Sequence, residues 1–373
     1  MLLALALAIA LAAPTEAQRK KKKGMEEEPT QVLEVLPEPP PFLTAETARV
    51  GFLVTPLSSK GLLSQQTRDA LRFLLRNNRG AQIAKIRAWV AGTGDLRRVP
   101  ALVAEEFTAK KQPLPVVSVI QVGELPAEGA QVLLEALTVE RRAVNSFGLA
   151  FFSGQQALKE ERTENPLEPV LPLASQSLEN LAAAAAGVGL RSGDLLRVTC
   201  LVSSLADHAA VSAKMAQMFP AAALALVQLQ RGPLRPVAEC EGVGRLPQAP
   251  RNEVELLNPA GLPSSPNYSQ VALVRSPKIL FTDPQLCFGP TESDVKLAFE
   301  RLKRDLEAAQ SGFDRVFFTS YYPLNNAIMD QIRARRFDYL DRARPPASTM
   351  ILFEGLPSLD AQFGVEVYAA ARE

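Results

Sequence analysis

Apolar runs and amphipathic stretches alternate along the chain, and the same order of elements occurs three times. In the first copy, residues 50–54 are an apolar run, and residues 64–78 place four apolar side chains on one face of a predicted helix. Residues 83–92 alternate between two faces, as a strand does. A second helix follows, with Asp95 as its candidate N-cap, and two apolar segments close the copy.

Residues 177–189 and 295–310 are the corresponding first helices of copies two and three. Each copy therefore predicts a β-α-β-α-β-β unit of about 100 residues, which is the size of a domain rather than of a solenoid repeat. This order predicts an α/β (α+β) fold in which helices cover one face of a mixed sheet. A basic residue opens the second predicted strand of each copy: Lys85, Arg197 and Arg315.

Shifts in composition between the copies indicate the domain boundaries. We expect domains at residues 46–142, 143–245 and 271–373. Residues 155–172 are rich in charge and proline, which is typical of an insertion, here within the second domain. Residues 246–270 contain NPAGLPSSPN at their centre and are expected to be the linker into the third domain.

The first 45 residues differ from the rest of the chain. An apolar run near the start has the length of a signal-peptide core and is too short for a stable membrane span. We therefore expect a signal peptide at residues 1–17 and an exported protein, periplasmic or secreted. Five cations at residues 19–23 oppose translocation, and a translation start at Met25 would make the protein cytoplasmic. Residues 18–45 are rich in charge and proline and are expected to be a disordered linker.

Composition excludes several classes of function. The chain has 41 basic and 40 acidic residues, a net charge of +1, so it lacks the basic field typical of nucleic-acid binding. Cys200, Cys240 and Cys287 have no metal-like spacing and are expected to be ordinary strand and loop cysteines. His208, the single histidine, lies at an expected helix start. We therefore expect no metal site and no cofactor.

Each copy carries one glutamate inside an apolar closing strand: Glu135, Glu241 and Glu366. A carboxylate is costly to bury unpaired, so this placement predicts either a cleft or a buried hydrogen bond. Two interpretations stay open, a group that activates water or an inherited structural partner. Glu239 lies on the same strand face as Glu241, and a close pair of carboxylates would raise the pKa of one of them.

Several local strings resemble the RidA/YjgF family, also known as endoribonuclease L-PSP. In copy two, FFSGQQA at residues 151–157 resembles the family's opening strand and SGQ turn, and residues 176–207 resemble the helix and strand that follow. In copy three, PPASTMILFEGLP at residues 345–357 resembles the P-A-R-[ST]…LP stretch, and copy one has ELP at residues 124–126. The resemblance covers residues 46–373.

This resemblance implies a chorismate-mutase-like fold and homotrimers with a ligand cleft at each subunit interface. A chain with three copies is then expected to close an intramolecular pseudo-trimer, a monomer with small-molecule ligands possible at its inter-domain clefts. The implied reaction is hydrolysis of a 2-imino or enamine acid to a keto acid and ammonia. An arginine grips the substrate carboxylate in this chemistry, and a glutamate activates water. Glu135, Glu241 and Glu366 are the candidate catalytic residues.

The arginine of the family motif is absent from all three copies. Counting back from LP, or its equivalent, places Val117, Leu224 and Ser348 at its position. Arg231 and Arg344 lie near these strands and are the candidate substitutes for binding the substrate carboxylate. The alternative for both is a surface charge near a turn.

Three functions follow from these observations. The first is an imine or enamine deaminase, a hydrolase with one or two working clefts. The second is a non-catalytic pseudo-trimer that binds a small ligand or serves as a scaffold. The third is an endoribonuclease. The absent arginines favour the second over the first, and the near-neutral charge argues against the third because RNA binding depends on cationic contacts.

Overall fold

Three β-sheets organise residues 36–372, the part of the chain that the computed structural model describes. In the first sheet the strand order is β2 (Val50–Val54), β5 (Val132–Val139), β3 (Gln82–Ala91) and β4 (Val116–Val122). β5 is antiparallel to both of its neighbours, whereas β3 and β4 are parallel because a helical crossover joins them. The sheet is therefore mixed, as the alternation of elements predicts.

The second sheet repeats this order. β6 (Leu149–Leu158) pairs with β9 (Val237–Arg245), β9 with β7 (Leu195–Val202), and β7 runs parallel to β8 (Ala223–Gln228). In each repeated unit the closing strand, β5 or β9, lies between the first and second strands of that unit, which places the closing-strand glutamate in the middle of the sheet.

The third sheet has the same core. β12 (Lys278–Thr282) and β13 (Gln285–Phe288) both pair with β16 (Ala361–Ala370), which pairs in turn with β14 (Val316–Tyr321). β14 runs parallel to β15 (Ala347–Met350) at the edge. The three sheets with their helices confirm a mixed α/β architecture.

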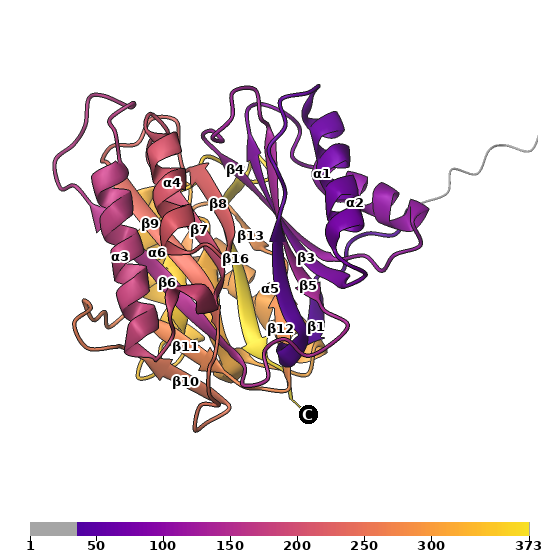
Figure 1. Ribbon diagram of the computed structural model, residues 1–373, viewed down its shortest axis with the longest axis vertical. Helices are drawn as coiled ribbons and strands as arrows, with labels where there is room; N and C mark the ends of the chain where they lie inside the picture. The colour runs from indigo at the N-terminus through magenta and orange to yellow at the C-terminus, as the bar shows by residue number, and fades with distance from the viewer. Residues whose placement is uncertain (1–35, 373) are drawn as a thin grey trace, which may run out of the picture. The chain divides into compact units, whose positions relative to one another are not determined.

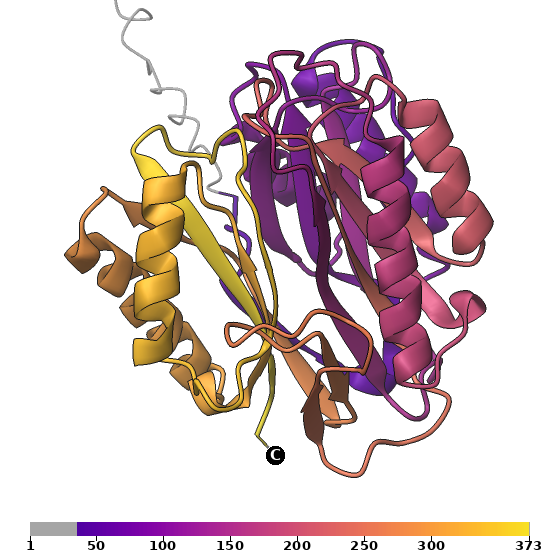
Figure 2. The same cartoon turned by 90° about the vertical axis from the view of Figure 1, so that its left-hand side faces the viewer.

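Two amphipathic helices accompany each sheet and cover one of its faces (Figures 1 and 2). The six helices, in chain order, are α1 (Leu63–Asn77), α2 (Arg98–Ala109), α3 (Leu171–Gly187), α4 (His208–Met218), α5 (Glu292–Ala308) and α6 (Asn326–Arg335). Short 3₁₀ turns precede or follow strands and helices at Thr47–Arg49, Ser192–Asp194, Phe313–Arg315 and Arg336–Asp338. Asp95 does not cap α2: its N-cap is Arg97, whose backbone N–H donates to the Asp95 carboxylate at 3.0 Å.

Three further strands extend the second and third sheets, and one of them, β11 (Val271–Val274), belongs to the second sheet although it falls within the expected third domain at 271–373. β1 (Phe42–Glu46) extends the third sheet by pairing with β12. β11 pairs with β6 of the second sheet, and β10 (Val254–Leu257) adds the outermost strand beside it. The segment 246–270, predicted to be a linker, thus contains a strand. These additions satisfy the free backbone groups at two sheet edges.

The faces of the sheets without helices pack against one another and form a shared interior. Phe151 of β6 contacts Phe317 and Tyr368 of the third sheet, with ring centroids 4.9 and 5.8 Å away. Trp89 of β3 stacks on Phe353 after β15 at 5.7 Å. Burial of aromatic side chains on this scale favours close association of the sheets. The interior where the three sheets meet therefore holds whatever polar groups their central strands carry.

Among residues 36–372, no helix is both long enough and apolar enough to cross a membrane. The expected signal peptide at residues 1–17, and most of the expected linker at 18–45, lie outside the described residues.

Candidate functional site

The three closing-strand glutamates meet in one buried cluster, which we call the central cluster. Arg87 of β3 contacts all three: its Nη2 donates to Glu366 Oε1 at 2.6 Å, and its Nη1 lies 3.2 Å from Glu241 Oε1 and 3.7 Å from Glu135 Oε2. Exposure of the three glutamates is 5%, 2% and 0% for Glu135, Glu241 and Glu366. The residues that the sequence proposes as three separate catalytic groups thus share one arginine.

Two more cations complete the central cluster. Lys85 Nζ lies 2.9 Å from Glu366 Oε2, and Arg197 Nη2 lies 2.5 Å from Glu241 Oε1. Burial by itself would raise the pKa of Glu366, but Lys85 and Arg87 outweigh it and lower this pKa to about 2. Burial likewise opposes ionisation of Glu241, and Arg197 with Arg87 lowers its pKa below the ordinary value. Three carboxylates therefore face three cations.

Hydroxyl groups also donate to the three carboxylates, although Glu135 Oε2 has no hydrogen-bond partner. The donors are Thr199 to Glu135, Thr349 to Glu241 at 2.5 Å, and both Ser118 and Tyr322 to Glu366, the last at 2.8 Å. Strand register explains why a single arginine fits. Arg87 is paired with Glu135, whereas the residues paired with Glu241 and Glu366 are the small Thr199 and Ser320. Two small side chains leave room for one guanidinium at the meeting point of the sheets.

This setting does not suit a water-activating base. Such a base needs a pKa nearer to the working pH and an approach for substrate, whereas Glu241 and Glu366 are held ionised by internal cations in a closed interior. Of the two interpretations drawn from the sequence, the environment favours the structural partner. In the sequence, this cluster could have been recognised from Lys85 and Arg87, two cations on the same face of an otherwise apolar strand.

The recurring strand cations are equivalent in two sheets only. Lys85 and Arg197 each lie two residues before the position paired with the glutamate, and both are buried. Arg315 instead precedes β14. All three strands have a bulge at this point, but the residue equivalent to Lys85 and Arg197 is Phe318, and Arg315 Nη2 pairs with Glu253 at 2.6 Å. The expectation that all three recur as equivalent residues is therefore wrong for Arg315.

Sheet register relates the three positions counted back from LP. Val117 pairs with Ile86, Leu224 with Val198, and Ser348 with Thr319, in each case one residue before the partner of the glutamate. The three positions counted from the sequence are thus equivalent in space, and none carries a cation.

Val117 lines a pocket of about 420 Å³ with Asp283, which follows β12 of the third sheet, and with Pro37, Pro39 and Pro40. Burial raises the pKa of Asp283 to about 7, against the opposing effect of Lys85. A part of the proline-rich segment therefore lies against the first of the three motif positions.

At the third position, Ser348 joins the second and third sheets. Its backbone N–H donates to Ser153 Oγ at 2.8 Å, and Ser153 is the serine of the SGQ string. Gly154, which follows Ser153, packs against Glu239 of β9. The Glu239 carboxyl group accepts a hydrogen bond from Gln156 Nε2 at 2.9 Å. Burial raises the pKa of Glu239 to about 8, with a small further rise from Glu241. The sequence-based expectation of one raised pKa in this pair applies to Glu239.

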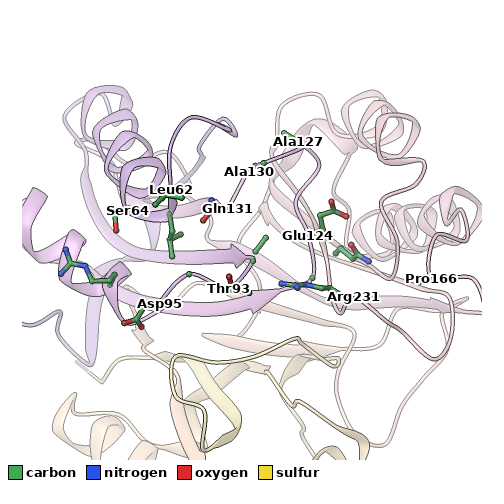
Figure 3. Close-up of a pocket in the computed structure, with 18 of the residues that line it drawn as sticks. Leu62, Ser64, Thr93, Asp95, Glu124, Ala127, Ala130, Gln131, Pro166 and Arg231 are labelled. Atoms are coloured by element: carbon green, nitrogen blue, oxygen red, sulfur yellow. The ribbon is translucent and has the colours of Figure 1, made fainter.

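Arg231 and Arg344, the two candidate substrate-binding arginines, lie apart. Arg231 follows β8 and lines a cleft of about 850 Å³ between the first and second sheets, together with Asp95 and Glu124 (Figure 3). Arg344 is exposed and lines a separate depression of about 320 Å³ beside Arg315. The structure brings neither arginine into the central cluster.

Two of the three cysteines form a disulfide that the sequence reasoning missed. Cys200 of β7 and Cys240 of β9 are direct partners across the sheet, and their sulfurs are 2.08 Å apart. The 40 residues between them hide this pairing in the sequence. Cys287 is buried with a free thiol. Among the residues described, no group of His, Cys, Asp and Glu side chains has the geometry of a metal site, and half-buried His208 begins α4.

Comparison with known proteins places this architecture. The sequence model described as Endoribonuclease L-PSP matches residues 139–258, which include the second sheet's core strands. A RutC family protein from Haemophilus influenzae is 31% identical over 116 residues, which are 31% of this chain and 82% of that protein. The chain belongs to the RidA/YjgF family.

Solved structures of the family resemble parts of the chain at lower identity. A Rid family protein of unknown function from Yersinia pestis is 18% identical, with a TM-score of 0.28, and the match covers 32% of this chain and 99% of that one. A member of the YjgF family from Mycobacterium tuberculosis is 15% identical, with a TM-score of 0.24, over 32% of this chain and 99% of that one.

Proposed function

We propose that the chain is a monomeric pseudo-trimer of three RidA-like domains that binds a small ligand and has lost arginine-dependent imine hydrolysis. The observation that carries this proposal is the set of side chains at the three equivalent motif positions. Val117, Leu224 and Ser348 cannot form the bidentate pair by which a guanidinium grips a carboxylate.

The central cluster supports the same proposal. Glu241 and Glu366 pair with cations of the chain itself, which lower the pKa of both carboxyl groups and make them weak bases. The cluster joins residues of all three sheets, because Arg87 of the first contacts glutamates of the second and third. In this proposal the glutamates hold the three domains together.

Ammonia release from freshly generated 2-iminopropanoate and 2-iminobutanoate tests the proposal. We expect the purified chain to release ammonia at the spontaneous rate, because no cation stands at the motif positions. Glu239→Gln and Glu241→Gln are assayed beside it, and an active RidA protein serves as positive control. Acceleration by the wild-type chain would overturn the proposal.

A second candidate function is residual imine hydrolysis at the boundary of the second and third sheets. The observation in its favour is Glu239, a carboxyl group with a pKa of about 8 that lies next to the SGQ turn and forms no ion pair within 4.0 Å among residues 36–372. A group with such a pKa exchanges protons near neutral pH. In the same assay, acceleration that disappears in Glu239→Gln but persists in a folded Glu241→Gln variant would assign the activity to this boundary.

Endoribonuclease activity, which the family's description names, has less support. The net charge of +1 provides little of the cationic surface on which RNA affinity depends. We expect no nucleic-acid partner.

We propose in addition that the protein is exported. The Cys200–Cys240 disulfide supports this proposal, because disulfides persist mainly in oxidising compartments. Cell fractionation followed by intact-mass measurement is expected to find a chain that lacks residues 1–17 and has both thiols oxidised. A cytoplasmic protein with free thiols at these two positions would contradict the proposal.

A further inference from the structure

The cleft between the first and second sheets is a site distinct from the motif positions. It is lined by the turns that follow β3 and β4 on one side, and by the end of β8 with the loop around Leu167 on the other. Val117 is the second residue of β4 and Gly123 follows the last, so the two ends are about 20 Å apart along the strand. At about 850 Å³ the cleft has the size of a small-molecule site.

Opposite charges face this cleft from the two sheets. Glu124 follows β4, Arg231 follows β8, and both lie at the end of the cleft opposite Asp95 (Figure 3). No ion pair within 4.0 Å joins Glu124 to a cation among residues 36–372. Arg231 is half-exposed, and its Nε is 3.7 Å from Glu354 Oε1, a weak pair in contact with solvent. One negative and one positive group are thus available to a ligand.

Amide and apolar groups complete the lining. Gln228 is buried and uses its Nε2 to donate to the backbone oxygens of Ser203 and Gln230 at 3.1 and 3.3 Å, which leaves its Oε1 as an acceptor. Leu62 and Leu167 are 78% and 64% exposed and stand on opposite sides of the cleft. Leucines this exposed are unusual unless something covers them.

Direct hydrogen bonds bridge all three interfaces at this end of the sheets. Between the first and second sheets, the Gly123 backbone N–H donates to the Gln228 oxygen at 2.9 Å, and the Gln228 backbone N–H donates to the Glu124 oxygen at 3.0 Å. The Gln121 backbone N–H donates to the Gly355 oxygen at 2.9 Å, between the first and third sheets. Gln230 Nε2 donates to the Phe353 oxygen at 2.8 Å, between the second and third. At the cleft, these bonds hold the main chains of Glu124 and Gln228 side by side.

We propose that this cleft binds a zwitterion with an apolar side chain, of the class of α-amino acids and short peptides. The ligand's ammonium group faces the Glu124 carboxylate and the Gln228 oxygen, its carboxylate faces Arg231, and its side chain covers Leu62 and Leu167. Loss of either charged contact is expected to weaken binding about tenfold, so both ends of the ligand contribute to its affinity. This inference concerns ligand binding at the cleft. Ammonia release, which tests imine hydrolysis, is therefore a separate measurement, and either result can fail without the other.

Isothermal titration calorimetry of the full chain tests this site. The probes are L-leucine and the peptides Leu-Leu and Leu-Leu-Leu, and the comparison between them separates a free amino acid from a peptide as the ligand. N-acetyl-leucine, which lacks the ammonium group, and leucinamide, which lacks the carboxylate, are the matched analogues. We expect at least one zwitterionic probe to bind. Both analogues are expected to bind at least about tenfold more weakly than that probe.

Variants assign the binding to the two charged groups. Glu124→Gln and Arg231→Met are expected to weaken zwitterion binding about tenfold, whereas Glu128→Gln, on the same exposed turn but outside the lining, leaves it unchanged. Thermal unfolding verifies that each variant is folded. No binding of any probe at millimolar concentration, equal binding of the analogues, or equal effects of Glu124→Gln and Glu128→Gln would each overturn the proposal.

Discussion

Glu239 and Glu241 are two residues apart on one face of β9, both are buried, and their pKa values move in opposite directions. Burial raises the pKa of Glu239 to about 8. The same burial acts on Glu241, but Arg197 and Arg87 lower its pKa below the ordinary value. The difference lies in the partners: Glu241 faces two guanidinium groups, whereas Glu239 has the neutral amide of Gln156.

This comparison separates two uses of a buried carboxylate. A buried charge must be paired or neutralised. In the central cluster the Glu241 carboxylate is paired with two cations, of which Arg87 comes from the first sheet. At the boundary of the second and third sheets the carboxyl group stays neutral up to a higher pH, which leaves it able to exchange a proton. Position on the strand is therefore a weaker guide to chemistry than the identity of the facing residues.

The largest expected effect comes from removing the shared cation. Arg87→Met keeps an unbranched, apolar side chain in the interior but leaves Glu135 without a guanidinium within 4.0 Å and deprives Glu241 and Glu366 of one. Breaking a buried ion pair from one side costs about 3–5 kcal/mol, so the variant is expected to lose at least this much free energy of unfolding. Urea denaturation monitored by circular dichroism measures the loss.

Arg97→Met is the matched control, because Arg97 pairs with Asp95 on the surface with 76% of its side chain exposed. Solvent screens such an exposed pair, so the control should have a free energy of unfolding near that of the wild type. If Arg87→Met and Arg97→Met had similar stabilities, the central cluster would not hold the three sheets together.

Part of this arrangement could be predicted from the sequence, and part could not. The amphipathic pattern locates α1 to within one residue, because helix periodicity is a local property. The repeated glutamates are visible for the same reason. Their partners are not, since Arg87 and Glu241 are 154 residues apart and meet only when two sheets pack together. Strands β10 and β11, which extend the second sheet, are four residues long. Such short strands give no reliable periodic pattern of apolar residues.

A smaller effect, opposite in its pH dependence to that of the central cluster, is expected from Glu239. Its folded-state pKa of about 8 lies above the ordinary value of 4.5, so the folded chain binds an additional proton between these values. Stability is then present at low pH and lost as pH rises towards 8. For Glu366, whose pKa is about 2, the sign is reversed: its contribution is present above about pH 4.5 and lost on acidification.

Glu239→Gln removes the pH-dependent loss of stability because the amide does not titrate. It keeps the size of the side chain and a carbonyl oxygen that can accept the hydrogen bond from Gln156. We expect the variant to gain about 2–3 kcal/mol relative to wild type between pH 5 and pH 8, because one unit of pKa shift corresponds to 1.36 kcal/mol and relaxation of the site reduces the full value. Urea denaturation across this pH range measures the gain, with the exposed Glu160→Gln as control. Parallel pH profiles for wild type and Glu239→Gln would mean that Glu239 is ionised in the folded chain. Glu239 would then be ionised like Glu241, and it could not serve as a proton-exchanging group at the boundary of the second and third sheets.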